Sequence, residues 1–485
     1  MRLSRTVFVV TKTHAEDPAN PGPAPVNHKG RIIVSSLVGT TIEFYDFYIY
    51  ATAAISVFPL LFFHSSGGNG ALLASLATFG VAFVARPLGS VLFGHFGDRA
   101  GRKATLLASL LTMGVATVLI GLLPTYTSIG IVAPMLLALM RFCQGLGLGG
   151  EWSGASLLAG ENSRAGKRGF DSMWPQLGAP FGFLLANGFF FMLTMTMNYD
   201  STQATTNHAF LAWGWRLPFL FSAVIVALGL YVRFKLHETP SFQRTKDRGE
   251  VVKAPVLEVF RSSWRDLIRG TFIMLATYTL FYLMTTWILS YAIGKVALGY
   301  LGISYHSFLV VQLITICAFA LTIPISGLLG DKLGRKRFLL VVTVAIIAFG
   351  LSFGFFLDPA RMGTGSSANL VLMTVFMLIG MALMGLTFGI QSALLPELFP
   401  TNVRYTGSAI SYNVSSILGA AVAPFIAAWL AARFGPGSVG LYLVAMAVLT
   451  LIALITTHET RDLDLDAIGR DKPAGEVPES VLVDA

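Results

Sequence analysis

Long apolar segments alternate with short polar segments along most of the chain. Each apolar segment approaches or exceeds about 20 residues, the length of helix needed to cross the hydrocarbon core of a bilayer. The pattern therefore predicts an all-α integral membrane protein with twelve transmembrane helices. The expected spans are residues 32–63, 71–96, 104–123, 129–158, 170–197, 211–232, 270–293, 303–329, 338–357, 370–395, 406–432 and 439–456.

A ten-residue motif occurs twice in the chain. Residues 94–103 read GHFGDRAGRK and residues 327–336 read GLLGDKLGRK, so that Asp98 and Asp331 are 233 positions apart. Each copy lies between two apolar segments, where the chain leaves the membrane, turns at a glycine and re-enters. The repeated motif predicts that the chain is a doubled unit.

A second match supports this duplication. A glutamate with an arginine seven residues later comes after the fourth span and again after the tenth. Two six-helix pseudo-repeats in parallel orientation are therefore expected. The predicted parts are a tail (residues 1–30), a first six-helix half (31–235), a linker (236–268), a second half (269–457) and a tail (458–485).

Composition and charge agree with a membrane protein. Of 485 residues, 54% are hydrophobic and 12% are charged, against about 25% charged residues in soluble proteins. Most of the 34 lysines and arginines lie in the tails and in loops that follow alternate spans. This bias predicts that both termini are cytoplasmic, and it excludes the concentrated basic domain of a nucleic-acid-binding protein. Cys143 and Cys317 fall inside spans, so neither a disulfide nor a metal site is expected.

Four ionisable residues lie inside predicted spans of the first half: Glu43, Asp46, Arg86 and Arg141. Each costs at least about 2.5 kcal/mol at mid-bilayer, and Glu43 and Asp46 share one helical face. A carboxylate beside an arginine stays ionised, whereas one moved into apolar surroundings takes up a proton. We therefore expect Glu43 or Asp46 to carry a proton and Arg141 to modulate it. A permanent salt bridge joining the first, second and fourth spans is the alternative.

The second half offers only neutral polar and aromatic side chains at this depth. We expect the first half to handle the proton and the second half to contribute hydrogen bonds and aromatic surfaces to a substrate. The guanidinium of Arg86 suits a carboxylate, although pairing with Asp46 is an alternative, and helix packing is the alternative for the aromatic residues. The predicted substrate-binding residues are Tyr50, Arg86, Arg141, Gln144, Tyr278, Tyr282, Gln391 and Asn413.

Charged residues near the cytoplasmic ends of the spans predict a gate between the halves. The glycines of residues 145–150, together with Gly380, Gly385 and Gly389, are expected to allow close helix packing and not to bind phosphate, because no strand precedes them. The predicted gate residues are Gly94, Asp98, Arg102, Glu151, Glu161 and Arg168 in the first half, and Gly327, Asp331, Arg335, Glu397 and Arg404 in the second.

The repeated motif resembles the loop signature of the major facilitator superfamily. Residues 42–50 (IEFYDFYIY), 85–103 (ARPLGSVLFGHFGDRAGRK), 141–152 (RFCQGLGLGGEW) and 395–407 (LPELFPTNVRYTG) resemble the metabolite:proton symporters, bacterial carriers of shikimate, 2-oxoglutarate, citrate, and proline or betaine. The resemblance implies a two-half transporter fold in a bacterial inner membrane, an acid in the first span facing an arginine in the fourth, and gate networks that stabilise an outward-facing state. The short tail lacks the coiled coil of the osmosensing members.

These observations predict a secondary active transporter, which takes up a small organic acid or zwitterion together with a proton by alternating access. It is expected to act as a monomer in the lipid bilayer, driven by the proton gradient without cofactor or metal. The sequence shows neither a nucleophile triad nor a histidine cluster, so we do not expect an enzyme. A proton-coupled efflux antiporter for cationic or apolar compounds would require uncompensated acids in the cavity. A non-transporting metabolite receptor would be expected to carry a soluble signalling domain.

Overall fold

The computed structural model of the chain consists of helices joined by short loops in the parts that it describes, and these parts hold no β-strand. Residues 1–28 of the predicted tail, residues 235–254 around the predicted linker and residues 464–485 of the second tail lie outside them. The side chains of Asp98 and Arg102 lie outside them as well. The described residues are 29–63, 68–100, 102–163, 166–197, 209–234, 255–400 and 403–463.

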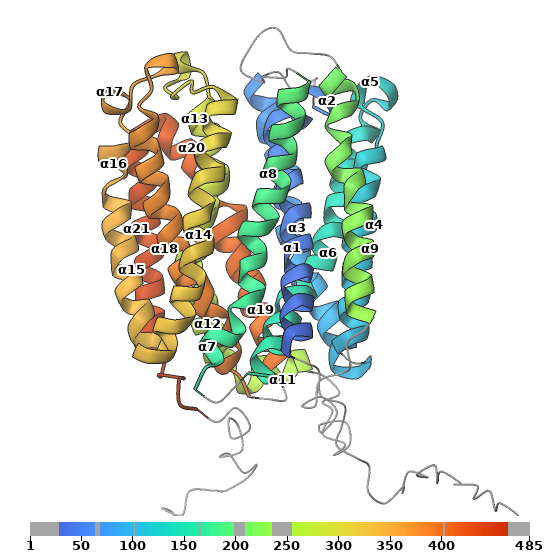
Figure 1. Ribbon diagram of the computed structural model, residues 1–485, viewed down its shortest axis with the longest axis vertical. Helices are drawn as coiled ribbons and strands as arrows, with labels where there is room; N and C mark the ends of the chain where they lie inside the picture. The colour runs from blue at the N-terminus through green and yellow to red at the C-terminus, as the bar shows by residue number, and fades with distance from the viewer. Residues whose placement is uncertain are drawn as a thin grey trace, which may run out of the picture.

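The helices form two bundles that stand side by side, the first half of the chain in one and the second half in the other (Figure 1). Helix α1 begins and helix α21 ends at the same end of the bundle, which we call the terminal face (Figure 1). The first bundle contains α1 (Lys29–Ser56), α2 (Phe58–Leu61), α3 (Gly68–Ala100), α4 (Arg102–Leu122), α5 (Tyr126–Ile129), α6 (Val132–Glu161), α7 (Arg168–Ser172), η2 (Trp174–Leu177), α8 (Gly178–Thr196), η3 (Phe210–Gly214) and α9 (Arg216–Phe234).

The second bundle begins with a short amphipathic helix at the terminal face. Its elements are α11 (Pro255–Ser262), α12 (Trp264–Tyr282), η4 (Leu283–Trp287), α13 (Ile288–Ile293), η5 (Val296–Leu298), α14 (Tyr305–Leu333), α15 (Arg335–Leu351), α16 (Phe353–Phe356), α17 (Pro359–Met362), η6 (Gly365–Ser367), α18 (Leu370–Glu397), α19 (Arg404–Ser416), η7 (Ile417–Ala421), α20 (Ala423–Phe434) and α21 (Pro436–Thr456).

Eleven helical segments within the described residues are long and apolar enough to cross a membrane. The remaining predicted span, the ninth (residues 338–357), corresponds to α15, which has 17 residues and is followed after Ser352 by α16. The twelve-helix prediction is therefore confirmed in its order along the chain. The turn predicted within the second copy of the motif is also present, because Gly334 has φ +96, a value that favours glycine.

Several spans predicted as continuous helices are interrupted, and the sixth begins with the π-helical turn η3 before α9. The fifth is broken by the 3-10 turn η2, which contains Pro175. The seventh and eleventh contain the π-helical turns η4 and η7, a feature that often marks functional sites. In η7, Gly419 approaches the Cβ of Tyr278, so the irregular backbone lies beside an aromatic side chain that faces the space between the halves.

The glycines of the fourth span allow α6 to approach α3 closely, as predicted. A Cβ on Gly149 would meet the backbone of Arg86 and lie 2.5 Å from the Ser90 nitrogen. Neither backbone group can rotate away as a side chain does. Gly385 and Gly389 on α18 play the same part against α14, where added Cβ atoms would meet the Phe319 and Ile323 carbonyls.

We expect Gly149→Val to lower the stability of the folded protein by at least about 1–3 kcal/mol, because the added atoms overlap a packed backbone. Gly188→Val on α8 is the matched control, since nothing lies within 4 Å of the Cβ position there. The measurement is the apparent melting temperature of both purified variants. Equal melting temperatures would contradict the close-packing role of Gly149.

Candidate functional site

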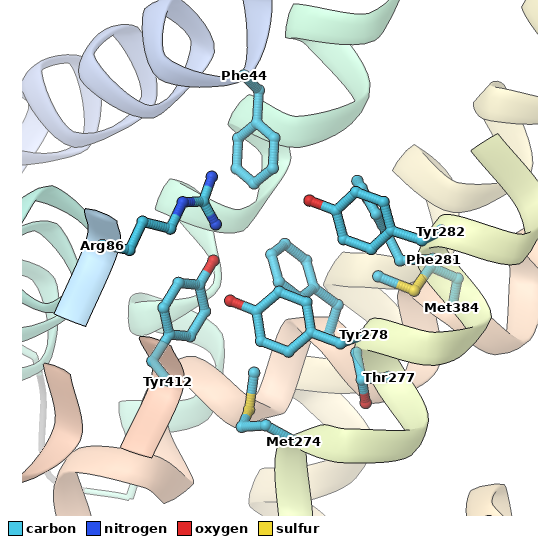
Figure 2. A pocket seen from close by; sticks show the side chains of 10 residues that line it. Phe44, Arg86, Met274, Thr277, Tyr278, Phe281, Tyr282, Met384 and Tyr412 are labelled. Carbon is cyan, nitrogen blue, oxygen red and sulfur yellow. The ribbon is translucent and has the colours of Figure 1, made fainter. Parts of the chain in front are cut away.

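A narrow cavity lies between the two halves. Helices α1 and α3 contribute to it from the first half, and α12, α18 and α19 from the second. Figure 2 shows the guanidinium of Arg86 and the hydroxyls of Tyr278, Tyr282 and Tyr412 turned toward the same space. The space holds little more than a water molecule, so a metabolite enters only if the halves move apart. The lining residues are Phe44, Arg86, Met274, Thr277, Tyr278, Phe281, Tyr282, Met384, Phe388 and Tyr412.

Arg86 reaches the cavity from the interior of α3, directly before Pro87. Its side chain is buried, and its guanidinium lies 4.8 Å from the ring centre of Phe83 and 5.6 Å from that of Phe47. Within the described part of the chain it makes no ion pair, and its Nε has no hydrogen-bond partner. Arg86 therefore presents a positive charge to the cavity that aromatic faces stabilise only weakly.

Asp46 is held inside the first half by two hydroxyl groups. Thr117 on α4 donates a hydrogen bond to Oδ2 over 2.8 Å, and Ser222 on α9 donates to Oδ1 over 2.6 Å. The side chain is 1% exposed. Both carboxylate oxygens are therefore satisfied without an arginine.

Arg141 is connected to Asp46 indirectly. Its Nη1 donates to Oε1 of Gln144 over 3.0 Å, and Nε2 of Gln144 donates to the Thr117 hydroxyl over 2.6 Å. The guanidinium also lies over the ring of Tyr50, 4.1 Å from its centre. A change in the protonation of Asp46 can thus alter the hydrogen bonds of Arg141 through Thr117 and Gln144, which are neutral polar groups. In a low dielectric, the hydrogen bonds of such a chain strengthen one another.

Glu43 differs from Asp46, although the two share one face of α1. It is 2% exposed, and its Oε2 has no hydrogen-bond partner among the described residues. None of the ion pairs among the described residues involves Glu43 or Asp46. The permanent salt bridge considered from the sequence is therefore absent from this arrangement.

The predicted substrate-binding residues fall into two groups. Arg86, Tyr278 and Tyr282 line the cavity. The other five do not line it. Arg141 and Gln144 are hydrogen-bonded to each other, and the ring of Tyr50 lies against the Arg141 guanidinium. Gln391 donates to the Thr277 hydroxyl over 2.8 Å, and Asn413 donates to the Gly149 carbonyl over 3.0 Å.

Phe44 and Tyr412 are cavity residues that were missed as site residues. Phe44 lies within residues 42–50, next to Glu43, and Tyr412 precedes the predicted site residue Asn413. Their proximity to predicted site residues indicated a possible role in the site. It was not sufficient, because most aromatic side chains in membrane helices pack against neighbouring helices. The direction in which each ring points became known only from the fold.

A stacked pair of aromatic side chains closes the cavity toward the terminal face. The rings of Trp152 on α6 and Tyr412 on α19 are 3.9 Å apart and inclined by 8°. The Trp152 indole donates to Oε1 of Gln176 over 2.9 Å, and Nε2 of Gln176 donates to the Phe388 carbonyl over 2.7 Å. These contacts join the two halves on the side of the cavity that faces the terminal face.

Ion pairs join the halves further toward the terminal face. Arg168 on α7 donates to Oε1 of Glu397 on α18 over 2.9 Å, and Arg335 on α15 lies 3.4 Å from Oε2 of Glu397. The backbone amides of Gly169 and Phe170 donate to the two oxygens of Asp331, each over 2.9 Å. One first-half element, α7, is thus held by two second-half carboxylates, those of Glu397 and Asp331.

The remaining predicted gate residues lie around these contacts. Glu161 and Arg404 line a small polar cavity together with Arg168 and Glu397. Gly94 faces Tyr405 and Thr406 of α19, and Gly327 faces the Gly169 carbonyl.

Glu151 pairs with Arg233 of α9, within the first half. Glu151 had instead been predicted to belong to the gate. Arg233 was missed because it lies just beyond the end of the predicted sixth span and far from Glu151 in sequence.

A second polar cavity lies between the halves on the other side of the aromatic residues. It is lined by Tyr48, Thr52 and Asn187 of the first half and by Thr285, Thr286 and Gln312 of the second, with four apolar residues. The Thr52 hydroxyl donates to Oδ1 of Asn187 over 2.8 Å. The part of the chain that the structure describes contains no group of three or more histidine, cysteine or acidic residues that could hold a metal ion.

Comparison with known proteins gives consistent matches over nearly the whole chain. The family described as "Sugar (and other) transporter" matches residues 32–259 and 249–471. The chain is 54% identical to the inner membrane metabolite transport protein YhjE of Escherichia coli strain K12, over 91% of this chain and 97% of the relative. It is 34% identical to the shikimate transporter of the same organism, over 91% and 97%. The structure of the proton:xylose symporter XylE aligns with a TM-score of 0.66 at 17% identity, over 90% of this chain and 98% of that one, which shows a shared fold.

Proposed function

The chain belongs to the sugar (and other) transporter family of the major facilitator superfamily, and we propose that this transporter takes up a small organic acid or zwitterion together with a proton. The proposal includes a bacterial inner-membrane location with both termini in the cytoplasm, which the distribution of lysines and arginines supports. The similarity to the shikimate transporter supports a carboxylate substrate.

The observation that carries this proposal is the burial of two acids and two arginines without an ion pair between them. Glu43, Asp46, Arg86 and Arg141 are each at most 4% exposed, and a charge buried in this way is costly unless it is paired or used. A carrier that alternates between loaded and empty states can use such groups, because a proton neutralises a buried acid and an anionic substrate neutralises a buried arginine.

Glu43 is proposed as the proton carrier. Its Oε2 is open to a proton, whereas both oxygens of Asp46 already accept hydrogen bonds. Glu43 lies within electrostatic range of Arg86. Protonation of Glu43 would leave the positive charge of Arg86 uncompensated, which favours binding of an anion. The proton and the substrate are thereby coupled to one another.

Alternating access requires that the contacts at the terminal face break. The Trp152–Tyr412 stack and the Arg168–Glu397 pair both join the halves there. We propose that this arrangement is the state closed to the cytoplasm, and that the halves rock apart to release substrate and proton.

The test is uptake into proteoliposomes with an imposed pH gradient. Radiolabelled monocarboxylates, dicarboxylates and betaines are supplied outside, and we expect one of them to accumulate when the outside is more acidic. A protonophore should abolish the accumulation. Accumulation driven only by an acidic interior would instead indicate an antiporter, and binding without any accumulation would indicate a receptor.

A further inference from the structure

We propose that the cavity beside Arg86 selects a monocarboxylate carried on an apolar body. This inference rests on the proposed function, because it names the substrate class of the same site. It excludes sugars, polyols, cations and dicarboxylates as preferred substrates. Three features of the cavity carry it: one positive charge, a cluster of hydroxyls beside that charge, and an apolar remainder.

The charge of the cavity favours one carboxylate. Among the described residues that line it, Arg86 carries the single charge, and no acid faces the space. Arg86 is 4% exposed, and the Nε of its guanidinium has no partner in the described part of the chain. Its fork of donors matches a carboxylate in two hydrogen bonds. A cationic substrate would meet only repulsion, and the second charge of a dicarboxylate would lie against uncharged walls.

The polar atoms of the cavity gather near this charge. The hydroxyls of Tyr278, Tyr282 and Tyr412 point toward the Arg86 side of the space (Figure 2). The remaining lining hydroxyl, that of Thr277, already accepts a hydrogen bond from Gln391. The site therefore offers donors to a carboxylate and few free partners elsewhere, which disfavours a substrate covered with hydroxyl groups.

The rest of the lining is apolar. Phe281 and Met384 lie on the side of the space away from Arg86, and Phe44 covers the first-half side (Figure 2). Met274 and Phe388 complete the apolar lining. Rings and thioethers of this kind pack against flat apolar bodies, and methionine adapts to irregular shapes. A ring that bears one carboxylate would place its charge on Arg86 and its body against this lining.

The experiment measures binding by isothermal titration calorimetry to the purified full-length protein in lipid nanodiscs, without any gradient. The probes are benzoate and cyclohexanecarboxylate, with cyclohexanecarboxamide, cyclohexane-1,4-dicarboxylate, acetate, gluconate and trimethylglycine as matched comparisons. We expect the two ring monocarboxylates to bind at least about tenfold more tightly than each comparison. Arg86→Gln should weaken them by about ten- to a hundredfold, the loss expected for a charged hydrogen-bonding group.

Two further variants make the result decisive. Phe388→Ala should weaken the ring acids but leave acetate unchanged, and Arg361→Gln, at an exposed arginine of α17, should change nothing. Equal or tighter binding of the amide, gluconate, trimethylglycine or the dicarboxylate overturns the inference. So does the absence of binding, or unchanged affinity in a monodisperse Arg86→Gln variant. Ring acids that bind without proton-driven uptake contradict the proposed function alone, and proton-driven uptake of another class contradicts this inference alone.

Discussion

Replacing Glu43 by glutamine should abolish proton-driven accumulation while preserving substrate exchange. The amide imitates the protonated acid but neither takes up nor releases a proton, so the variant should still bind substrate and change conformation. With an interior two pH units more alkaline than the exterior, coupling to one proton permits about 100-fold accumulation, because each unit is worth about 1.4 kcal/mol. We expect the variant to reach no accumulation in the same proteoliposomes, with counterflow close to that of the wild type.

Asp46→Asn is the matched control for this experiment. Asp46 lies one turn from Glu43 on the same helix face, and its carboxylate is held by the Thr117 and Ser222 hydroxyls, which an amide can also satisfy. We expect this variant to accumulate substrate. If Asp46→Asn loses accumulation and Glu43→Gln keeps it, Asp46 is the proton carrier, and loss in both variants would show that neither acts alone.

Replacing Glu397 by glutamine should open the terminal face. Glu397 is 2% exposed and pairs with Arg168 across the two halves, while Arg335 and Thr460 also contact it. Removing one partner of a buried pair costs about 3–5 kcal/mol. The cost falls on the closed state alone, because the pair between the halves exists only there. The remaining contacts of Arg335 with Asp331 reduce the effect, so we expect the open state to be favoured by at least about tenfold.

The measurement is the labelling rate of a cysteine introduced at Ser156, which lines the polar cavity beside this pair. Cys143 and Cys317 are first replaced by serine, and a membrane-impermeant maleimide is added from the side of the terminal face. Labelling should become at least about tenfold faster in Glu397→Gln, and proton-driven uptake should fall. The exchanged pair Arg168→Glu with Glu397→Arg should restore slow labelling.

Glu151→Gln tests whether the effect depends on a contact between the halves. It also removes a buried carboxylate from an arginine, but Glu151 and Arg233 lie within one half and move together. We expect unchanged labelling at Ser156→Cys in this variant. Equal opening in Glu151→Gln would show that the labelling reports general loosening and not the cross-half pair.

Much of the fold was predictable because the insertion of a helix into a membrane depends on the summed hydrophobicity of about 20 neighbouring residues. The spans, their order and the duplication followed from hydropathy and from the two copies of the motif. The interruptions at η2, η4 and η7 did not follow. A π-helical turn depends on what packs against the backbone, and apolar runs of similar composition occur with and without one.

The candidate site was predictable in its residue types but not in its contacts. Glu43, Asp46, Arg86 and Arg141 were identified because charges are costly in lipid, and the structure places all four in the interior. Pairing of Asp46 with Arg86 was an alternative that the sequence left open, yet the hydrogen-bond partners of Asp46 are Thr117 and Ser222. Threonine and serine are common in membrane helices, so nothing in their local sequence distinguishes these two from the others.

The sequence by itself determined that this chain lies in lipid, that it consists of two related halves, and that charged groups lie inside the first half. These properties depend on local composition and repetition. The tertiary structure alone decided which side chains share the space between the halves, that Trp152 and Tyr412 stack across them, and that Asn413 joins α19 to α6. The physical reason is that such contacts join helices far apart in the chain, and their geometry depends on helix rotation and packing, which residue order does not specify locally.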